Sequence, residues 1–451
     1  MVLAVGGACA MLRARTGQAF RSVGVPVRHF SQVGSGKMME GMMVLELATV
    51  LAGPSVGQFL GELGARVIKV ESPKTHGDVT RTWKLPMEGD DVEISAYFSS
   101  CNVGKESIVI DMATDQGKQV VHDLAAKADC VVVNYKPGDA EKLGVDYETL
   151  SKLNERLIYG QITGYGLDDK RVGYDAVIQA ESGLQYMNGT PDTEPCKLPL
   201  PLVDIIGAHM LKQGILVELW RRERTGRGGM VNASLANAAI ATLVNQGLGY
   251  LREGVVPQRI GSDHPTIVPY GTVFATKDPN ELLTIAVGSD KQFRSLCEVL
   301  GHPDLADPNG KYAHNPSRCK HRDELKASLR ELFAQHSRSE LLQKLADHRI
   351  PCGPVNDLRD AFKQHQAEEL VVFADDEPRE RSPDQNPLPF PNRNAVGVRQ
   401  AAFKGIPEGL DGTCNLSRPP KYGEHTEQIL REVLGYDTQK IETLMQEGTT
   451  A

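Results

Sequence analysis

A single aspartate stands where a carboxylate could act on a substrate. Asp204 lies within residues 199–207, an apolar, proline-rich segment that leads into a long helical pattern. Aspartate is preferred at the start of a helix, because its side chain accepts hydrogen bonds from free backbone N–H groups, so capping is the simplest interpretation. A carboxylate sheltered by apolar residues can instead act as a nucleophile or a base. The local sequence leaves both interpretations open.

A second candidate is the turn at residues 52–57, which follows a strand-like run and opens a helical pattern. The N–H groups at the start of a helix can bind a phosphate or another anion. The segment lacks the glycine spacing of a dinucleotide-binding loop and has no P-loop lysine. An ordinary strand–helix turn is therefore an equally good interpretation.

Other common catalytic signatures are missing from the sequence. Its histidines, cysteines and acidic residues show no metal-ligand spacing, so we expect no metal site. The absence of a G-x-S-x-G motif argues against an α/β-hydrolase. The eight cysteines include no C-x-x-C pair, which disfavours a zinc ribbon or disulfide scaffold and fits a reducing compartment.

The elements that must position these residues are visible as short apolar runs. Strands are expected at residues 43–47, 67–70, 108–110, 131–133 and 157–159. Apolar stripes at residues 56–63 and 120–128 predict helices between them. This alternation predicts an α/β fold with a doubly wound parallel sheet, in which ligands bind at the carboxyl ends of strands near a topological switch point.

Beyond these elements the pattern changes to a smaller α+β domain. Long helical patterns at residues 205–224 and 231–252 lead into it, and residues 377–394 form a proline-rich, charged loop. Its expected elements are a strand at 282–287 and helices at 291–300, 323–336 and 339–348, with one more helix at 424–434. The predicted organisation is a transit peptide (1–38), a large domain (40–230), a linking helix (231–255), a small domain (256–375) and a return to the large domain (376–451).

The first 39 residues contain five basic residues and no acidic residue. Such a segment is typical of a mitochondrial transit peptide, although a plain N-terminal tail is the alternative. The sequence therefore predicts a mitochondrial matrix protein.

The 451-residue chain has a net charge of −8, which argues against a nucleic-acid binder. No apolar run approaches the ~20 residues of a membrane span. We expect small-molecule partners, and neither nucleic acid nor membrane.

Several short motifs together resemble the family III CoA-transferases, which include formyl-CoA and carnitine CoA-transferases and α-methylacyl-CoA racemase. The similar segments are residues 50–54, 63–71, 77–81, 134–138, 163–166, 173–177, 225–228, 350–355 and 423–426. They follow the family's order from residue 42 to the C-terminus. Residues 259–270 and 311–312 are most similar to the mitochondrial branch that moves CoA from succinyl-CoA to dicarboxylic acids such as glutarate or hydroxymethylglutarate.

The resemblance implies that Asp204 is the nucleophile, forming an aspartyl anhydride and then an aspartyl-CoA thioester. It implies coenzyme A as a co-substrate, no tightly bound cofactor, and an interlaced homodimer. Positions that match CoA-binding residues of the family are Val50, Leu51, Ala52, Asn134, Tyr135, Lys142 and Leu143. Positions that match active-site supporting residues are Tyr174 and Asp175. Substrate-binding candidates are Arg259, His264 and Trp83, and a surface loop is an equally good interpretation of the first two.

The sequence also departs from the family pattern. Ser72 stands where relatives often carry an arginine, and Ala113 where formyl-CoA transferase has a lysine. We expect Lys74 or Lys105 to replace these phosphate contacts. The glycine-rich loop of formyl-CoA transferase is absent, which argues against formyl-CoA and oxalate as substrates.

Two other functions compete with CoA transfer. In the racemase branch a histidine precedes the aspartate, where this sequence has Tyr174, and a phenol is a poor proton acceptor at neutral pH. The other alternative is a CoA-binding homologue without activity, which the retained Asp204 disfavours.

Overall fold

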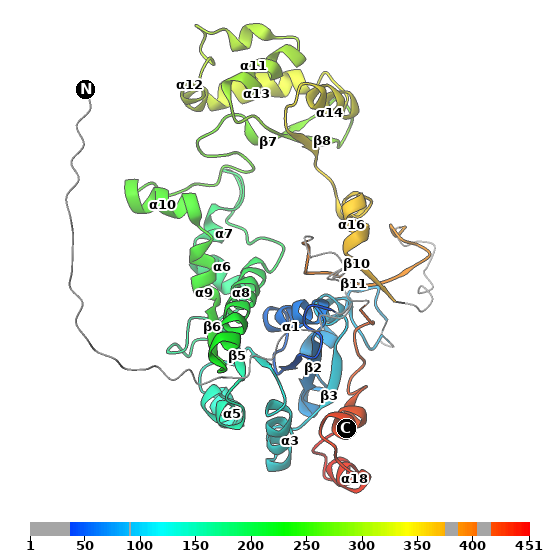
Figure 1. The fold of residues 1–451 in the computed structure, drawn as a ribbon. Coiled ribbons are helices and arrows are strands. Elements are labelled where there is room, and N and C mark those ends of the chain that lie inside the picture. The colour runs from blue at the N-terminus through cyan, green and yellow to red at the C-terminus, as the bar shows by residue number, and fades with distance from the viewer. Residues whose placement is uncertain (1–36, 90–91, 375–386, 404–415) are drawn as a thin grey trace, which may run out of the picture. The chain divides into compact units, whose positions relative to one another are not determined.

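A six-stranded parallel sheet forms the centre of the computed structural model, which describes residues 37–89, 92–374, 387–403 and 416–451 (Figure 1). Its strands are β1 (Met43–Glu46), β2 (Arg66–Glu71), β3 (Glu106–Val109), β4 (Cys130–Val133), β5 (Ile158–Thr163) and β6 (Gly229–Ser234). They lie in the order β3-β2-β1-β4-β5-β6, and every neighbouring pair is parallel. The order reverses between β1 and β4, so the predicted doubly wound sheet and its switch point are confirmed.

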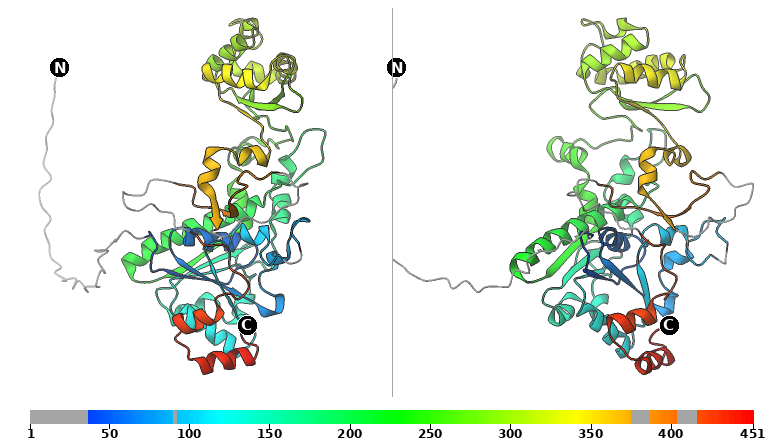
Figure 2. Two further views of the ribbon diagram at one scale, coloured as in Figure 1. Left: turned by 90° about the vertical axis from the view of Figure 1, so that its right-hand side faces the viewer. Right: turned by 45° about the vertical axis from the view of Figure 1, so that its right-hand side comes forward.

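Helices cover both faces of this sheet (Figure 2). On one face, α1 (Ala52–Glu62) and α8 (Leu202–Thr225) pack on strand residues such as Val44. On the other, α3 (Asp115–Ala125) and the C-terminal helices pack on the next strand residue, Leu45. Successive strand residues point to opposite faces, so strands between two helix layers are apolar on both sides.

The remaining elements around the sheet are short. They are α2 (Ala96–Ser99), α4 (Asp139–Leu143), α5 (Tyr147–Leu153), α6 (Asp175–Glu181), α7 (Leu184–Met187), α9 (Leu235–Ala241), α10 (Val244–Glu253), α17 (Thr426–Gln428), the π-helix η4 (Ile429–Val433) and α18 (Thr438–Gln446), with 3-10 turns η1 (Pro73–Thr75) and η2 (Val79–Thr82). Strands β10 (Val371–Ala374) and β11 (Asn394–Val398) form a separate antiparallel pair.

A three-stranded antiparallel sheet organises the second part of the chain. It contains β7 (Tyr270–Ala275), β8 (Leu282–Ala286) and β9 (Cys352–Pro354). Its helices are α11 (Asp290–Val299), α12 (Asn315–Lys320), α13 (Arg322–Phe333), α14 (Arg338–Asp347), α15 (Leu358–Ala361) and α16 (His365–Leu370), with the 3-10 turn η3 (Pro303–Ala306). These elements share one apolar core, in which the rings of Phe274 and Phe333 stack 4.2 Å apart. The predicted mixture of strands and helices is confirmed, whereas the exact domain boundaries stay a prediction.

Two secondary-structure predictions need correction. Residues 231–252 are not one helix, because Gly229–Ser234 pairs with β5 as β6 before α9 and α10 begin. The sheet partner overrides the local helical pattern there. The predicted 424–434 helix is a short α-helix followed by a π-helix, and α18 was not predicted at all.

Other parts of the predictions fall outside the described residues. The predicted transit peptide lies almost wholly in residues 1–36, and most of the proline-rich loop lies in residues 375–386. Among the described residues, no helix is long and apolar enough to cross a membrane.

Four charged side chains are buried together where β1, β2 and the approach to β3 meet. Lys69 Nζ lies 3.1 Å from Glu46 Oε1 and 3.0 Å from Asp78 Oδ2. The second ammonium group, Nζ of Lys105, lies 2.7 Å from Glu46 Oε2. All four side chains are at most 2% exposed, and their two positive and two negative charges balance. We call this group the buried charge cluster.

Lys69 and Asp78 keep their charges in the cluster by mutual attraction, whereas at Lys105 burial outweighs the attraction of Glu46 and lowers the pKa. Burial alone would lower the pKa of Lys69, but the carboxylates of Asp78 and Glu46 raise it above its ordinary value. Burial alone would raise the pKa of Asp78, but the Lys69 charge and the Thr80 N–H lower it. Gly57 is also required here, because a Cβ on it would lie 1.9 Å from Glu46 Oε2.

Removing one member should therefore destabilise the fold strongly. We expect Lys69→Met to lower the free energy of unfolding by about 3–5 kcal/mol, because it leaves two buried carboxylates short of a positive charge. The control is Lys344→Met, which breaks the exposed pair with Glu340 and should change the free energy of unfolding little. Urea unfolding of both variants measures the difference, and equal small losses would contradict this account.

Candidate active site

The turn between β1 and α1 meets the end of β4 at the switch point. The Thr49 N–H donates to Oδ1 of Asn134 over 3.1 Å, and Nδ2 of Asn134 donates to the Thr49 carbonyl over 2.7 Å. These reciprocal bonds fasten the two loops together. The structure thus brings together two of the predicted CoA-binding segments, residues 50–52 and Asn134.

Val50 has an unusual backbone that the buried charge cluster holds in place. Its φ of 71° lies in the left-handed region, which is costly for a β-branched residue. Its N–H donates to both carboxylate oxygens of Asp78, at 3.3 and 3.1 Å. Its carbonyl accepts from the Cys101 thiol at 3.3 Å. The cluster is therefore connected directly to the turn that leads into α1.

Helix α1 begins without a side-chain cap. Its cap residue, Leu51, makes no capping bond, so the positive end of the helix dipole lies at this turn, whose residues Ala52, Gly53 and Pro54 are buried. Gly53 permits the tight turn, because a Cβ there would lie 2.3 Å from the Cβ of Ala48. This end of α1 is suited to an anionic group, as its position at the switch point leads one to expect.

Asp204 is not the cap of its helix. Helix α8 begins after Pro201, so Asp204 is its third residue, and no side chain of the cap residue bonds to the helix. Asp175 caps the helix from outside it. Its Oδ1 accepts from the Val203 N–H at 2.8 Å and from the Asp204 N–H at 3.4 Å. The capping interpretation of Asp204 is therefore wrong, and its carboxylate is not used for that purpose.

The Asp204 carboxylate sits in an environment that disfavours its charge. Burial, and next the negative charge of Asp175, raise its pKa to about 7. In the part of the chain that the structure describes, its side chain has no hydrogen-bond or ion-pair partner. A carboxylate with this pKa is partly ionised at neutral pH and is more basic than ordinary aspartate, which favours nucleophilic attack.

Tyr97 is a candidate site residue that the sequence did not reveal. It lies on α2, and its ring meets Trp83 edge to face, with centroids 5.0 Å apart. Burial and then the negative charge of Asp204 raise its pKa to about 12, with smaller contributions from Cys101 and Asp175. The phenol therefore stays protonated near Asp204 and can donate a hydrogen bond. The local sequence did not distinguish it from the neighbouring core residue Phe98.

Tyr174 is the cap residue of α6 and Asp175 is the first residue of that helix, and their predicted role at the site stays a prediction. Tyr174 is 66% exposed, and its phenol is free of packing against the core. Asp175 is partly buried and contacts the start of α8.

The other predicted CoA contacts follow β4. Burial raises the pKa of Tyr135, whose carbonyl accepts from Gln161 at 3.3 Å. Lys142 is exposed and pairs with Asp139 at 2.9 Å, and Leu143 packs against the core. Only Lys142 of these three side chains presents a charge to solvent.

The structure does not place the two acceptor-binding candidates against Asp204. Arg259 donates to the carbonyls of Thr193 and Tyr186, at 3.1 and 3.3 Å. The His264 ring lies edge to face with Tyr270, and its Nδ1 accepts from the Thr266 N–H. Both therefore have local structural roles in the described residues, and their binding roles remain predictions.

The suggestion that Lys105 contacts a phosphate is wrong, because the Lys105 side chain is buried and bonded to Glu46, Asn102 and the Pro54 carbonyl. Lys74 remains available: its side chain is 61% exposed and pairs with Asp111 at 3.2 Å.

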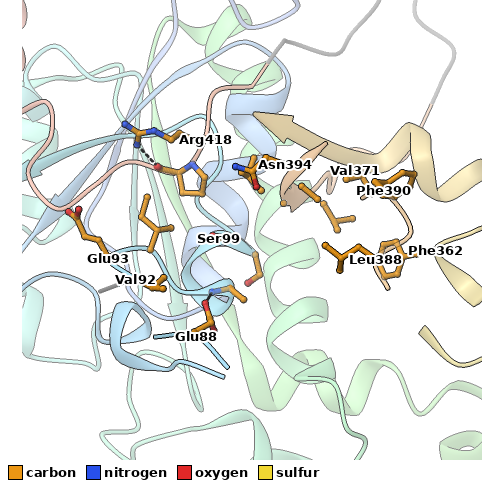
Figure 3. A pocket seen from close by; sticks show the side chains of 18 of the residues that line it. Glu88, Val92, Glu93, Ser99, Phe362, Val371, Leu388, Phe390, Asn394 and Arg418 are labelled. Atoms are coloured by element: carbon orange, nitrogen blue, oxygen red, sulfur yellow. Dashed lines mark hydrogen bonds between the residues drawn. The ribbon is translucent and has the colours of Figure 1, made fainter. Parts of the chain in front are cut away.

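A pocket of about 770 Å³ lies against α2, the helix that carries Tyr97 (Figure 3). Its wall includes Ser99 of α2, Phe390, and residues of β11. The carboxylate of Glu93 at its edge already accepts from the Tyr422 N–H at 3.2 Å. The pocket is mainly apolar and does not include Asp204.

Comparison with known proteins agrees with this geometry. The model of CoA-transferase family III matches residues 39–426. The chain belongs to CoA-transferase family III. It is 36% identical over 423 residues to the mouse succinyl-CoA:glutarate CoA-transferase, covering 93% of this chain and 91% of that protein. It is also 36% identical over 403 residues to a succinate–glutarate CoA-transferase of Agrobacterium fabrum, covering 88% and 95%.

A solved structure extends the similarity to the fold. The crystal structure of a CaiB/BaiF family protein from Brucella suis has a TM-score of 0.74 and 37% identity, covering 88% of this chain and 99% of that one. The family resemblance noted in the sequence is thus confirmed, and the protein is a CoA-transferase.

The raised pKa of Asp204 predicts a cost in stability. Because its folded-state pKa of about 7 exceeds the ordinary 3.8, folding loses stability as pH rises from about 4 to 7 and stays lower above that. We expect Asp204→Asn to be near neutral at pH 4 and to stabilise by roughly 2–4 kcal/mol at pH 8. Urea unfolding at both values measures this, and a pH-independent difference would contradict the assignment.

Proposed function

We propose that this protein transfers CoA from succinyl-CoA to a dicarboxylic acid such as glutarate or a hydroxymethylglutarate-like acid, with Asp204 as the nucleophile. The observation that carries the proposal is the Asp204 carboxylate in the first turn of α8, which has no partner among the described residues and a pKa raised to about 7. Relatives named for succinyl-CoA and glutarate support the choice of substrates.

The proposed reaction begins when an Asp204 oxygen attacks the thioester carbonyl of succinyl-CoA. The C–S bond breaks, giving a succinyl-aspartyl anhydride and CoA thiolate. The thiolate then attacks the Asp204 carbonyl carbon and breaks its bond to the bridging oxygen. Succinate leaves with that oxygen, and Asp204 is left as a thioester of CoA.

The second half reverses these steps with the acceptor. A carboxylate oxygen of glutarate attacks the aspartyl-CoA thioester, giving a glutaryl-aspartyl anhydride and CoA thiolate. The thiolate attacks the glutaryl carbonyl, forming glutaryl-CoA and regenerating the Asp204 carboxylate. That carboxylate now contains an oxygen from glutarate, and no proton or water is consumed.

Neighbouring groups suit these steps. Each attack creates an oxyanion that needs hydrogen-bond donors, and Tyr97, with its pKa raised to about 12, remains a donor throughout the working pH range. The Trp83 ring against Tyr97 adds an apolar wall, which would help to keep water from the anhydride.

Coenzyme A would act as a co-substrate that comes and goes. The uncapped start of α1 and the turn at residues 50–52 would meet it at the switch point, beside Asn134. Lys142 and Lys74, which are exposed after β4 and β2, are the cations we propose for its phosphates.

Racemisation of an acyl-CoA is the main alternative. It needs a proton acceptor beside the α-carbon, and the position of the racemase histidine is taken here by Tyr174. A phenol is a poor base at neutral pH, so the site favours transfer.

We also propose a homodimer in the mitochondrial matrix. Helix α10 exposes several apolar side chains in the single chain, among them Leu251, which is 79% exposed, and a second subunit would cover them. Light scattering should give twice the chain mass, and import into isolated mitochondria should shorten the chain by roughly 38 residues. A monomer or an unprocessed chain would contradict these two statements.

Purified protein lacking the predicted transit peptide tests the function. Incubation with succinyl-CoA and glutarate should give glutaryl-CoA by mass spectrometry, and Asp204→Ala should lower the rate by at least about a thousandfold. Oxalate is the matched acceptor that should react poorly. No glutaryl-CoA, or full activity in Asp204→Ala, would refute the proposal, and loss of deuterium from the α-carbon of a 2-methylacyl-CoA would favour the racemase.

A further inference from the structure

We infer that Gln179 is a positioning residue for the Asp204 nucleophile. This inference rests on the proposed function. Gln179 lies on α6, its side chain is fully buried, and none of the family motifs in the sequence singled it out. Its proposed role follows from the hydrogen bonds that its amide nitrogen and amide oxygen make.

The Gln179 amide connects the two segments that form the start of α8. Its Nε2 donates to Oδ2 of Asp175 over 2.7 Å, one helical turn back on α6. The same nitrogen donates to the Leu200 carbonyl at 3.3 Å, and its Oε1 accepts from the Leu198 N–H at 2.9 Å. Gln179 therefore fixes both Asp175 and the chain that enters α8.

Asp175 connects Gln179 to the helix turn that carries the nucleophile. While Gln179 holds Oδ2, Oδ1 of Asp175 holds the N–H groups of Val203 and Asp204. The first turn of α8 is thus fixed from outside the helix, and the Asp204 side chain is left free. The cap residue, Pro201, offers no side chain that could replace this arrangement.

Few other charges surround this arrangement. Among the described residues, Asp175 on α6 and Tyr97 on α2 interact electrostatically with Asp204. Helix α6 also carries Glu181, which lies 3.8 Å from Arg171, and α7, which packs on α6, carries Tyr186. Helix α9, which packs on both α6 and α8, has no titratable side chain in Leu235–Ala241. On α1, Glu62 faces Lys212, two turns further along α8. A carboxyl group introduced at position 179 would therefore act mainly on Asp175.

The decisive variant is Gln179→Glu, which keeps the shape of the side chain. At low pH its neutral carboxyl group can still donate to Asp175. At higher pH it becomes a second carboxylate facing the first, so the hydrogen bond is lost and the start of α8 is released. We expect a new descending limb in the pH profile of kcat for succinyl-CoA:glutarate transfer, with KM for succinyl-CoA changed by no more than about twofold. Gln179→Leu, which cannot donate at any pH, should lower kcat about tenfold or more across the profile.

The chain offers a matched control in Gln58. This glutamine is also fully buried, donates to a carboxylate one turn away (Glu62, 2.9 Å) and to a backbone carbonyl (Val398, 3.1 Å). Gln58→Glu places two carboxylates together in the same way, but on α1 and against Glu62 rather than against Asp175, which holds the first turn of α8. It should lower thermal stability at high pH without adding a descending limb to kcat.

The outcomes separate this inference from the proposed function. If the wild-type protein transfers CoA in an Asp204-dependent way but Gln179→Glu keeps the wild-type pH profile, the positioning role is refuted and the function stands. If Gln58→Glu adds the same limb, the effect is only one of stability, and the role is also refuted. If the wild-type protein does not transfer CoA at all, the proposed function fails first. Should Gln179→Leu not fold, the comparison of the two glutamate variants still decides.

Discussion

The buried charge cluster is the constraint on which the first half of the sheet depends. Two lysines and two carboxylates are removed from water and form ion pairs with one another, which offset part of the cost of their burial. Their partners lie on β1, β2, the turn after β2 and the approach to β3. Through Asp78 the same cluster holds the left-handed Val50. The conformation of the turn at the switch point therefore depends on a carboxylate of the buried charge cluster.

Two carboxylates at the start of α8 have different roles. Asp175 is stabilised by backbone N–H groups and a buried amide, which is how a buried carboxylate is usually accommodated. Asp204, in the first turn of the neighbouring helix, has burial and a nearby like charge instead, so its pKa rises. Two aspartates close in space therefore have different properties, and only one of them retains free lone pairs for chemistry.

Sequence patterns predicted most of the fold because apolar strand runs and helical stripes are local features. They failed at β6, where pairing with β5 decides the structure, and they missed α18, a nine-residue helix that Asp437 caps. For the site, motif resemblance indicated Asp204, Tyr174 and Asp175. It could not show that Asp175 performs the capping, nor that Tyr97 lies near Asp204, because both depend on contacts between distant elements. It also suggested a phosphate contact for Lys105, although this side chain is buried and paired with Glu46. No local sequence pattern shows that burial.

Transfer of oxygen is the most direct test of Asp204 as the covalent carrier. The protein is incubated with succinyl-CoA and glutarate labelled with oxygen-18 in its carboxylates, and the peptide that contains Asp204 is then weighed. The proposed steps predict that this peptide gains oxygen-18 in the first turnover and that succinate gains it in later ones. Oxygen-18 passing from glutarate to succinate while the Asp204 peptide stays unlabelled would contradict the account.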